Sequence, residues 1–401
     1  MSKSYVKYFL ALLITLSFLS CESNILLISP PENDTKPVWP QVGYNGRHTG
    51  NRYGININIP PVQNGDVYWM DSTTHSWVND GSESACDANG NFYFRFSTAA
   101  GGKIIKYRPD GTRIWVRDSL QNDCYTGIAL SNDETKLYYS DWYKFTCLDS
   151  SGNLVWSIAN GSNWGTIPCV AKDGTIYTSF GFNLTAVSPD GNVKWRLFNT
   201  NVGTCWPVLD RDDNIIVQNT ITTGQYELLK INRDGNVIYR YKLSDWIFSA
   251  VIDGFNNIYF RYSDSLISLN ENFDTRWKRA IPGFDYAHVV PAITKENHII
   301  IDSGYVAVMS IDGQGKTDWI NLFPNSGFIE PYIVLDDEDN IYFNHLHDIF
   351  KLAVSSFDKN GNLRWQNIDP AIGWVLPGLT LSPLGMLFDT PKRPNVVFTI
   401  K

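Results

Sequence analysis

Aromatic side chains recur through this sequence at one place in a repeating pattern, and carboxylates stand beside several of them. Most lie 13 or 14 positions before a short apolar run; Trp206 is offset by about three. A flat ring can stack on a sugar or peptide while an adjacent carboxylate accepts its hydrogen bonds. The candidate ligand-binding residues are Tyr125, Trp164, Trp206, Trp246, Tyr286, Phe328, Trp374, Asp245, Asp285 and Glu330.

The same aromatic residues have a second interpretation, in which they plug loops and pack against neighbouring parts of the fold. Acid–base chemistry on a sugar would need two carboxylates about 5–10 Å apart. Asp245, Asp285 and Glu330 fall in successive repeats, and sequence does not give their separation. Both interpretations stay open, and no catalytic residue is assigned.

Other patterns with chemical potential are weaker. The acidic runs at 210–214 and 336–340 lack the twelve-residue calcium-loop spacing with its terminal Glu, and we interpret them as solvated turns. His345 and His347 alternate on one predicted strand without a third metal ligand. We find no Ser-His-Asp arrangement and no phosphate-binding glycine loop. The sequence therefore predicts no metal and no cofactor.

The elements that position these residues follow from an internal repeat. Asp-Gly or Asn-Gly turns, which form hairpins because Gly and Asn tolerate positive φ, precede an aromatic residue every 38 to 46 residues. A repeat of about 42 residues with four short strands is typical of a β-propeller blade. These predicted structural anchors are Trp69, Trp115, Trp156, Trp195, Tyr239, Trp277, Trp319 and Trp365.

The two ends of the chain complement each other. The stretch from Leu379 to Ile400 supplies three strands of a repeat, and the N-terminal stretch around Trp69 supplies only a fourth. Joining them closes the ring and removes exposed sheet edges. The sequence thus predicts an all-β, eight-bladed propeller of four-stranded blades, closed by an N-terminal strand that completes the last blade.

The repeat resembles the PQQ-type propeller repeat of the quinoprotein alcohol dehydrogenase-like superfamily. The resemblance rests on the turn Gly before each anchor Trp and on the opening segment 39–50; Tyr239 and the Gly-free turn before Trp277 depart from it. Dehydrogenases of that kind usually carry an adjacent cysteine pair, which this chain lacks, and no quinone-contacting residue can be placed. A PQQ-dependent dehydrogenase is therefore the least favoured function.

The N-terminus has the pattern of an export signal. Lys3 and Lys7 precede an apolar run of about a dozen residues, too short to span a bilayer. Residues 18–21 resemble the lipobox of bacterial lipoproteins, which implies cleavage before Cys21 and lipidation of that cysteine. The predicted parts are a signal peptide (1–20), a tether (21–36) and the propeller (37–401).

The composition limits the classes of molecule that this chain is expected to bind. The formal charge of −8, without a basic run, argues against nucleic-acid binding. Five cysteines remain after Cys21, and sequence does not pair them: Cys86, Cys124, Cys147, Cys169 and Cys205. We expect a monomeric, non-catalytic propeller, lipid-anchored to the outer membrane, that binds envelope proteins. The alternative is a carbohydrate-binding or carbohydrate-active protein that uses the aromatic residues to bind glycans.

Overall fold

The computed structural model describes most of the chain beyond its N-terminal segment. The predicted signal peptide, tether and Cys21 lie outside the described residues. Among the residues that the structure describes, no helix is long and apolar enough to cross a membrane. The described residues are 57–71, 84–98, 101–120, 127–159, 166–198, 200–202, 206–247, 249–281, 290–302, 307–322, 333–348, 351–369, 379–389 and 397–401.

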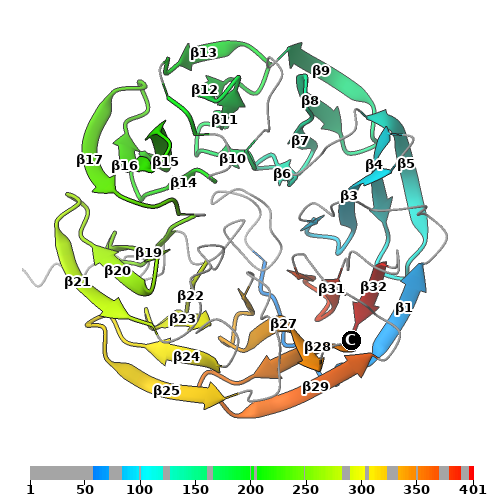
Figure 1. Cartoon of the computed structure of the whole chain (residues 1–401). Coiled ribbons are helices and arrows are strands. Elements are labelled where there is room, and N and C mark those ends of the chain that lie inside the picture. The colour runs from blue at the N-terminus through cyan, green and yellow to red at the C-terminus, as the bar shows by residue number, and fades with distance from the viewer. Residues whose placement is uncertain are drawn as a thin grey trace, which may run out of the picture. The chain divides into compact units, whose positions relative to one another are not determined.

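Eight four-stranded antiparallel sheets surround a common axis, which confirms the predicted eight-bladed propeller (Figure 1). The innermost strands are β2 (Ala85–Cys86), β6 (Ala129–Leu130), β10 (Cys169–Val170), β14 (Val208–Leu209), β18 (Val251–Ile252), β22 (Ala292–Ile293), β26 (Val334–Leu335) and β30 (Thr380–Leu381). The second strands are β3 (Phe92–Thr98), β7 (Lys136–Ser140), β11 (Ile176–Phe180), β15 (Ile215–Thr222), β19 (Ile258–Tyr262), β23 (Ile299–Asp302), β27 (Ile341–Asp348) and β31 (Leu387–Asp389).

The two outer positions of each blade complete the sheets. The third strands are β4 (Gly101–Tyr107), β8 (Lys144–Asp149), β12 (Asn183–Val187), β16 (Gln225–Ile231), β20 (Ser265–Leu269), β24 (Ala307–Ile311), β28 (Lys351–Phe357) and β32 (Val397–Ile400). The outermost strands are β5 (Arg113–Leu120), β9 (Leu154–Ala159), β13 (Val193–Arg196), β17 (Val237–Leu243), β21 (Thr275–Ala280), β25 (Thr317–Leu322), β29 (Leu363–Asp369) and β1 (Val67–Asp71). We number the blades 1 to 8 in chain order, from β2–β5 to β30–β32 with β1.

Burial along the strands explains their composition. The middle strands are covered on both faces by neighbouring blades, so runs such as Ile258–Phe260 are apolar and buried throughout. The outermost strands alternate between exposed and half-buried residues, because one face packs inward and the other meets solvent. The hydrophobic core is consequently a series of clusters, most of which lie between neighbouring blades.

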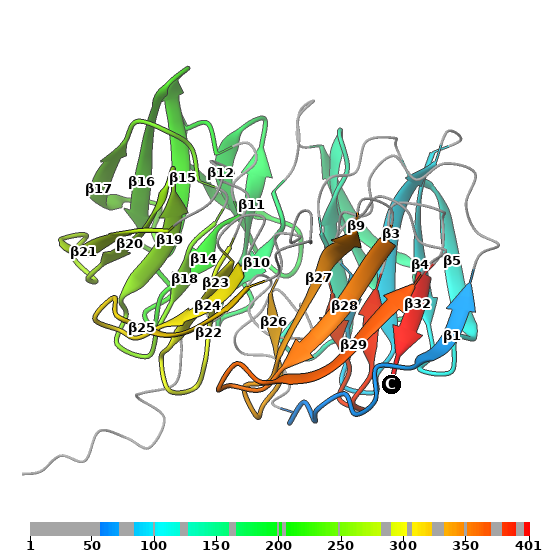
Figure 2. The same cartoon turned by 60° about the horizontal axis from the view of Figure 1, so that its bottom comes forward.

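The last blade closes the ring as predicted. β1 pairs antiparallel with β32, and Trp69 faces Thr399 in the register. The backbone N–H of Lys401 also donates to the carbonyl of Asp66 at 2.9 Å. Figure 2 shows β1 beside β32, so the first described strand and the last belong to one sheet.

All eight predicted anchors lie on outermost strands. Each of the seven tryptophans donates its indole N–H to a backbone carbonyl of the next blade, at 2.7–3.1 Å. The donor–acceptor pairs are Trp69–Pro109, Trp115–Ser150, Trp156–Pro189, Trp195–Arg233, Trp277–Gly313, Trp319–Lys359 and Trp365–Val62.

The turn glycine and the anchor tryptophan form a single contact between blades. Gly235, at φ +86°, lies against the indole of Trp195 in the preceding blade; a Cβ placed on it would come within 2.9 Å of the ring. Glycine is therefore required here twice, for its left-handed backbone and for the space that the indole occupies.

In one of these contacts, both the tryptophan and the glycine are replaced by other residues. In blade 4 the anchor is Tyr239, and the facing turn of blade 5 carries Phe273 at φ 68° instead of glycine. Their ring centroids are 6.1 Å apart, and the Tyr239 hydroxyl donates to Asn272 Oδ1 at 3.0 Å. The two departures from the repeat are thus two halves of one contact, in which a smaller ring leaves room for a side chain on the turn.

Candidate functional site

The predicted aromatic and acidic ring is only partly within the described residues. Trp206, Trp246 and Asp245 are described, and all three are half-buried. The remaining candidates lie outside the described residues: Tyr125, Trp164, Tyr286, Phe328, Trp374, Asp285 and Glu330. They stay predictions.

The chain segments that lead into blades 4 and 5 are hydrogen-bonded to two blades at once. Ahead of blade 4, the Val202 N–H donates to the carbonyl of Phe182 in blade 3, at 2.9 Å. The neighbouring Asn201 N–H donates to Asn219 Oδ1 in blade 4, at 2.7 Å. Ahead of blade 5, the Ser244 N–H donates to the hydroxyl of Tyr262 in blade 5 at 2.8 Å, and the Ile247 N–H donates to Gln218 Oε1 in blade 4. These segments therefore join neighbouring blades.

The described aromatic residues at these segments have structural contacts. Trp206 enters blade 4 but packs against the hydrophobic cluster of blades 5 and 6 that includes Val251 and Ile293. The Asp245 carboxylate accepts the backbone N–H of Trp246 at 2.8 Å. For Trp206, this placement favours packing between blades over an open ligand-stacking face.

At the turns between first and second strands, buried aspartates fold the backbone around their own carboxylates. Asp253 Oδ1 accepts the N–H groups of Phe255 and Asn257, each at 2.8 Å. Its Oδ2 accepts the Asn257 side chain at 2.8 Å and the Tyr259 hydroxyl at 2.7 Å. Burial, together with the Asp253 charge, raises the pKa of Tyr259, so the phenol keeps its donor proton.

The two acidic runs form turns as predicted, but the first and fourth residue of each run is buried rather than solvated. Asp210 is 1% exposed and Asp336 is 4% exposed. Asp336 caps its turn as Asp253 does, with Asn340 and Tyr342 as donors, and Asp210 forms a 2.8 Å ion pair with Lys230. The carboxylates are buried because the turn itself supplies their hydrogen-bond donors.

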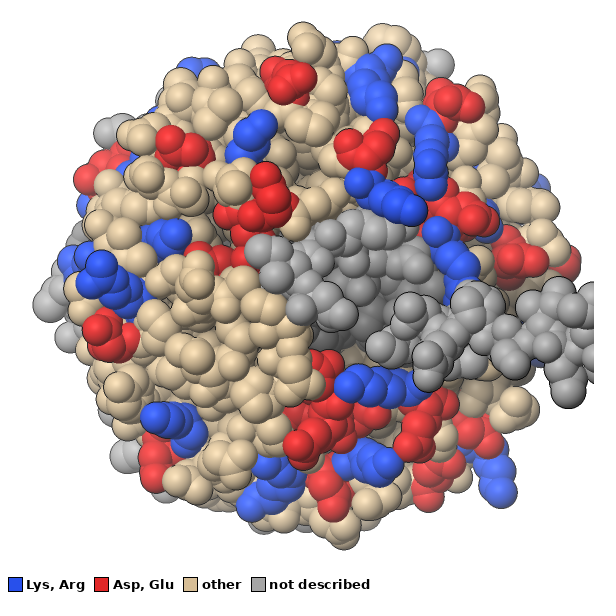
Figure 3. Space-filling view, turned by 180° about the vertical axis from the view of Figure 1, so that it is seen from behind, with Lys and Arg blue, Asp and Glu red and all other residues tan. Residues whose placement is uncertain are grey.

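In several of these turns, one residue has a positive φ and its side chain is hydrogen-bonded to the preceding blade. Its side chain accepts a backbone N–H from the preceding turn in five blades, with φ between 56° and 63°. The donor–acceptor pairs are Ala88–Glu134, Lys172–Asp213, Arg211–Asn256, Gly254–Asn297 and Lys295–Asp339. Figure 3 shows acidic and basic side chains interspersed on the face of the ring seen from behind.

Asp339→Asn is expected to raise the thermal midpoint at pH 7 by about 1–2 °C. Burial raises the pKa of Asp339 above its usual 3.8, so the ionised carboxylate costs stability at neutral pH. Asn keeps an acceptor for Lys295 and is the residue that blades 5 and 6 carry at this position, with the same φ.

The raised pKa of Asp339 determines how the stability difference between Asp339→Asn and the wild type changes with pH. The folded protein binds the Asp339 proton more tightly than the unfolded chain, so only the wild type gains stability as the pH falls through that raised pKa. The advantage of the variant should therefore vanish near pH 4. Thermal melts from pH 4 to 7 measure it, and an advantage that grows toward low pH would contradict the assignment.

The described cysteine side chains that the sequence analysis considered, and that of His345, lie buried in the fold. His345 is buried, and its Nε2 lies 2.9 Å from Ser355 Oγ. Cys86 is buried, Cys147 and Cys169 are buried free thiols, and burial raises the pKa of Cys147 to about 12. Among the described residues, no three His, Cys, Asp or Glu side chains gather as metal ligands.

The outer wall of the propeller contains two sectors that the sequence analysis missed. Three consecutive outermost strands, β1, β5 and β9, carry large apolar side chains that are each 40–54% exposed. Their two arginines are both engaged between blades: Arg113 pairs with Asp71 at 2.7 Å, and Arg117 donates to the carbonyl of Gly152 at 3.0 Å. This apolar sector is Val67, Tyr68, Met70, Ile114, Val116, Leu154 and Val155.

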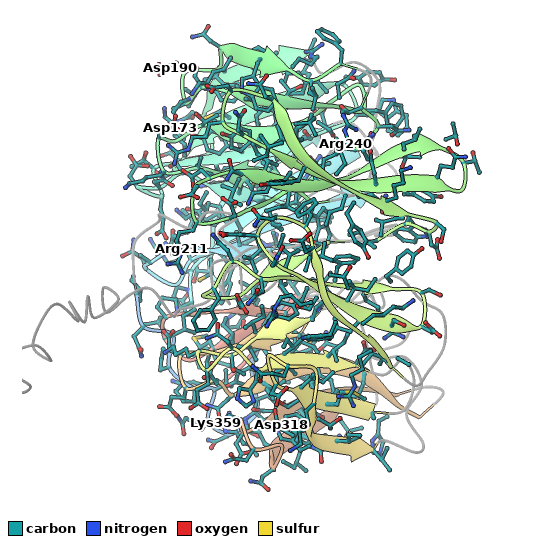
Figure 4. The ribbon with its side chains drawn as sticks, turned by 90° about the vertical axis from the view of Figure 1, so that its left-hand side faces the viewer. Asp173, Asp190, Arg211, Arg240, Asp318 and Lys359 are labelled. Carbon is teal, nitrogen blue, oxygen red and sulfur yellow. The ribbon has the colours of Figure 1, made fainter. Side chains whose placement is uncertain are left out.

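The next three outermost strands, β13, β17 and β21, are instead basic. Their 17 residues include seven Lys or Arg and no Asp or Glu, whereas the other five outermost strands together hold three basic and four acidic residues. This basic sector is Lys194, Arg196, Arg240, Lys242, Arg276, Lys278 and Arg279. Figure 4 views this side of the ring, with Arg240 on the wall and Asp173, Asp190 and Arg211 toward one end.

Alignment of the strands on their anchors is the signal that would have revealed both sectors. On six of the eight outermost strands, the residues one before and one after the anchor are exposed, as at Tyr68 and Met70 around Trp69. Read at those positions, blades 8, 1 and 2 are mainly apolar, and blades 3 to 5 are mainly basic.

Comparison with known proteins agrees with this architecture. A family model described as outer membrane protein assembly factor BamB matches residues 100–246. The crystal structure of BamB from Moraxella catarrhalis superposes with a TM-score of 0.59 at 13% identity, over 83% of this chain and 98% of that one. The C-terminal WD40 domain of Sif2 superposes with a TM-score of 0.63 at 10% identity, over 85% and 99%. No curated protein matches the sequence significantly.

Proposed function

We propose that this chain, a PQQ-like β-propeller repeat protein, is a non-catalytic scaffold of the bacterial cell envelope that binds other envelope proteins through its apolar sector. A lipid at Cys21 would tether it to the outer membrane. The export pattern at the N-terminus and the match to the assembly-factor family model over residues 100–246 support this setting.

The apolar sector is the observation that carries the proposal. Natural proteins protect exposed edge strands with charged residues, especially lysine, because an unprotected apolar edge associates with other chains. This chain follows that practice on blades 3 to 5 and not on blades 8, 1 and 2. Seven exposed large apolar side chains on three adjacent blades are the kind of patch that marks a protein-binding surface.

Met70→Lys with Val116→Lys is expected to reduce recovery of partner proteins about tenfold, because a lysine buried at an interface loses its hydration. Both positions face solvent in the free protein, so the fold should tolerate the change. The matched control is Leu322→Lys, at a side chain 71% exposed on blade 6.

The measurement is quantitative co-purification from cell envelopes with the tagged full chain. Equal recovery by the wild type, the control and the double variant would refute the proposed surface. Glycan-dependent recovery that survives the double variant would favour the carbohydrate alternative.

A further inference from the structure

The basic sector is not explained as protection of open edges alone. If lysine and arginine served only to prevent edge-to-edge association, all eight outermost strands would need them equally. Seven of the ten basic residues on these strands instead gather on β13, β17 and β21, which are consecutive in the ring. The protein as a whole carries a formal charge of −8, so this wall is a local reversal of its charge.

Few of these cations are neutralised by the protein. Lys194 pairs with Asp173 at 3.2 Å and Arg240 with Glu227 at 2.6 Å. Among the described residues, these are the only ion pairs that involve the sector.

Within the part of the chain that the structure describes, the other members of the sector have neutral partners or none. The Arg196 guanidinium and the Lys278 ammonium lie over aromatic rings, with centroid distances of 5.2 and 5.8 Å. Arg276 donates to the Tyr259 hydroxyl at 3.1 Å and to the carbonyl of Gly313 at 3.0 Å, so it keeps its charge at the wall. The sector thus retains a net positive charge.

The curvature of the wall selects the class of partner. Eight blades place successive outermost strands about 45° apart around the axis, so the walls of blades 3 and 5 face about 90° apart. A flat membrane surface would contact one of the three blades and meet the other two obliquely, and distant charges are screened in salt. A flexible chain can follow the curve and reach all three strands.

We infer that the basic sector binds an extended acidic segment of a partner protein. The inference rests on the proposed scaffold function and names the chemistry of a partner. The acidic side chain of Asp190, which lies toward one end of the ring (Figure 4), would disfavour binding of the same segment there and direct it to the wall.

The test measures binding of the full chain to a fluorescein-labelled Glu-Ser repeat peptide of about twelve residues, which spans about 40 Å when extended. The variant Lys194→Gln/Lys242→Gln/Lys278→Gln removes three charges from the sector. The matched control Lys316→Gln/Lys359→Gln/Lys401→Gln removes three exposed charges elsewhere.

Wild type and control should bind the peptide with affinities within about twofold of each other, and the sector variant about tenfold more weakly. Affinity of the wild type should fall steeply between low and physiological salt. A Gln-Ser peptide should not bind, and thermal melts confirm that each variant is folded.

Equal weakening in both triple variants, or no binding of the peptide by the wild type, would overturn the inference. Sector-dependent binding to phosphatidylglycerol vesicles with no binding to the peptide would overturn it in favour of a membrane surface. Loss of peptide binding in the sector variant, with unchanged partner recovery by Met70→Lys/Val116→Lys, would refute only the proposed apolar surface.

Discussion

Trp195→Ala is expected to lower the free energy of unfolding by about 3–4 kcal/mol, because it empties the space between two blades. The indole packs beside Tyr177 at a centroid distance of 5.8 Å, lies against Gly235, and donates to the carbonyl of Arg233 at 2.7 Å.

The measurement is the thermal and denaturant midpoint of the full chain, with an expected fall of about 5 °C. Trp195→Phe is the control: it keeps an aromatic ring and loses the hydrogen bond, so its loss should be smaller. Unchanged midpoints for the alanine variant would show that the anchor contact does not stabilise the ring.

The exchanged contact between blades 4 and 5 predicts strong coupling between two residues. Tyr239→Trp alone should destabilise the protein by about 1–3 kcal/mol, because the larger ring meets Phe273. Phe273→Gly alone should cost about 2–4 kcal/mol, since it deletes a buried ring while relaxing the positive φ.

The double variant should return to within about 1 kcal/mol of the wild type, because it rebuilds the contact seen between Trp195 and Gly235. A double-mutant cycle of denaturant unfolding measures the coupling. Additive losses in the double variant would mean that the two departures from the repeat are unrelated.

The fold could be predicted from the sequence because its signals are local and repeated. Each turn before an anchor, such as Pro189–Asn192 before Trp195, lies within a few residues of the strand it begins. The split last blade followed from counting strands at the two ends of the chain, and the pairing of β1 with β32 confirms it.

Contacts between blades were harder to predict because they join residues far apart in the sequence. Tyr239 and Phe273 are 34 positions apart, and each looked like an isolated exception. The burial of Asp336 was missed for a different reason: its acidic neighbours suggested solvent, whereas the Asn four residues later and the Tyr six later supply its donors.

Most of the candidate ligand-binding residues lie outside the described residues, so that site stays a prediction. Sequence reasoning concentrated on the aromatic residues before the innermost strands, and of those described Trp206 packs against neighbouring blades. The two sectors of the wall depend on which side of the outermost strands faces solvent. That register becomes visible only when positions such as Val116 and Lys278 are compared relative to their anchors.

Site-specific photo-crosslinking tests the proposed scaffold function most directly. A photoreactive residue is placed, one at a time, at the position after the anchor on each of the eight outermost strands, and at Trp246. The proposal predicts adducts with discrete envelope proteins at Met70, Val116 and Ser157 and none at Ile320. Adducts confined to Trp246, or absent from blades 8, 1 and 2, would contradict it.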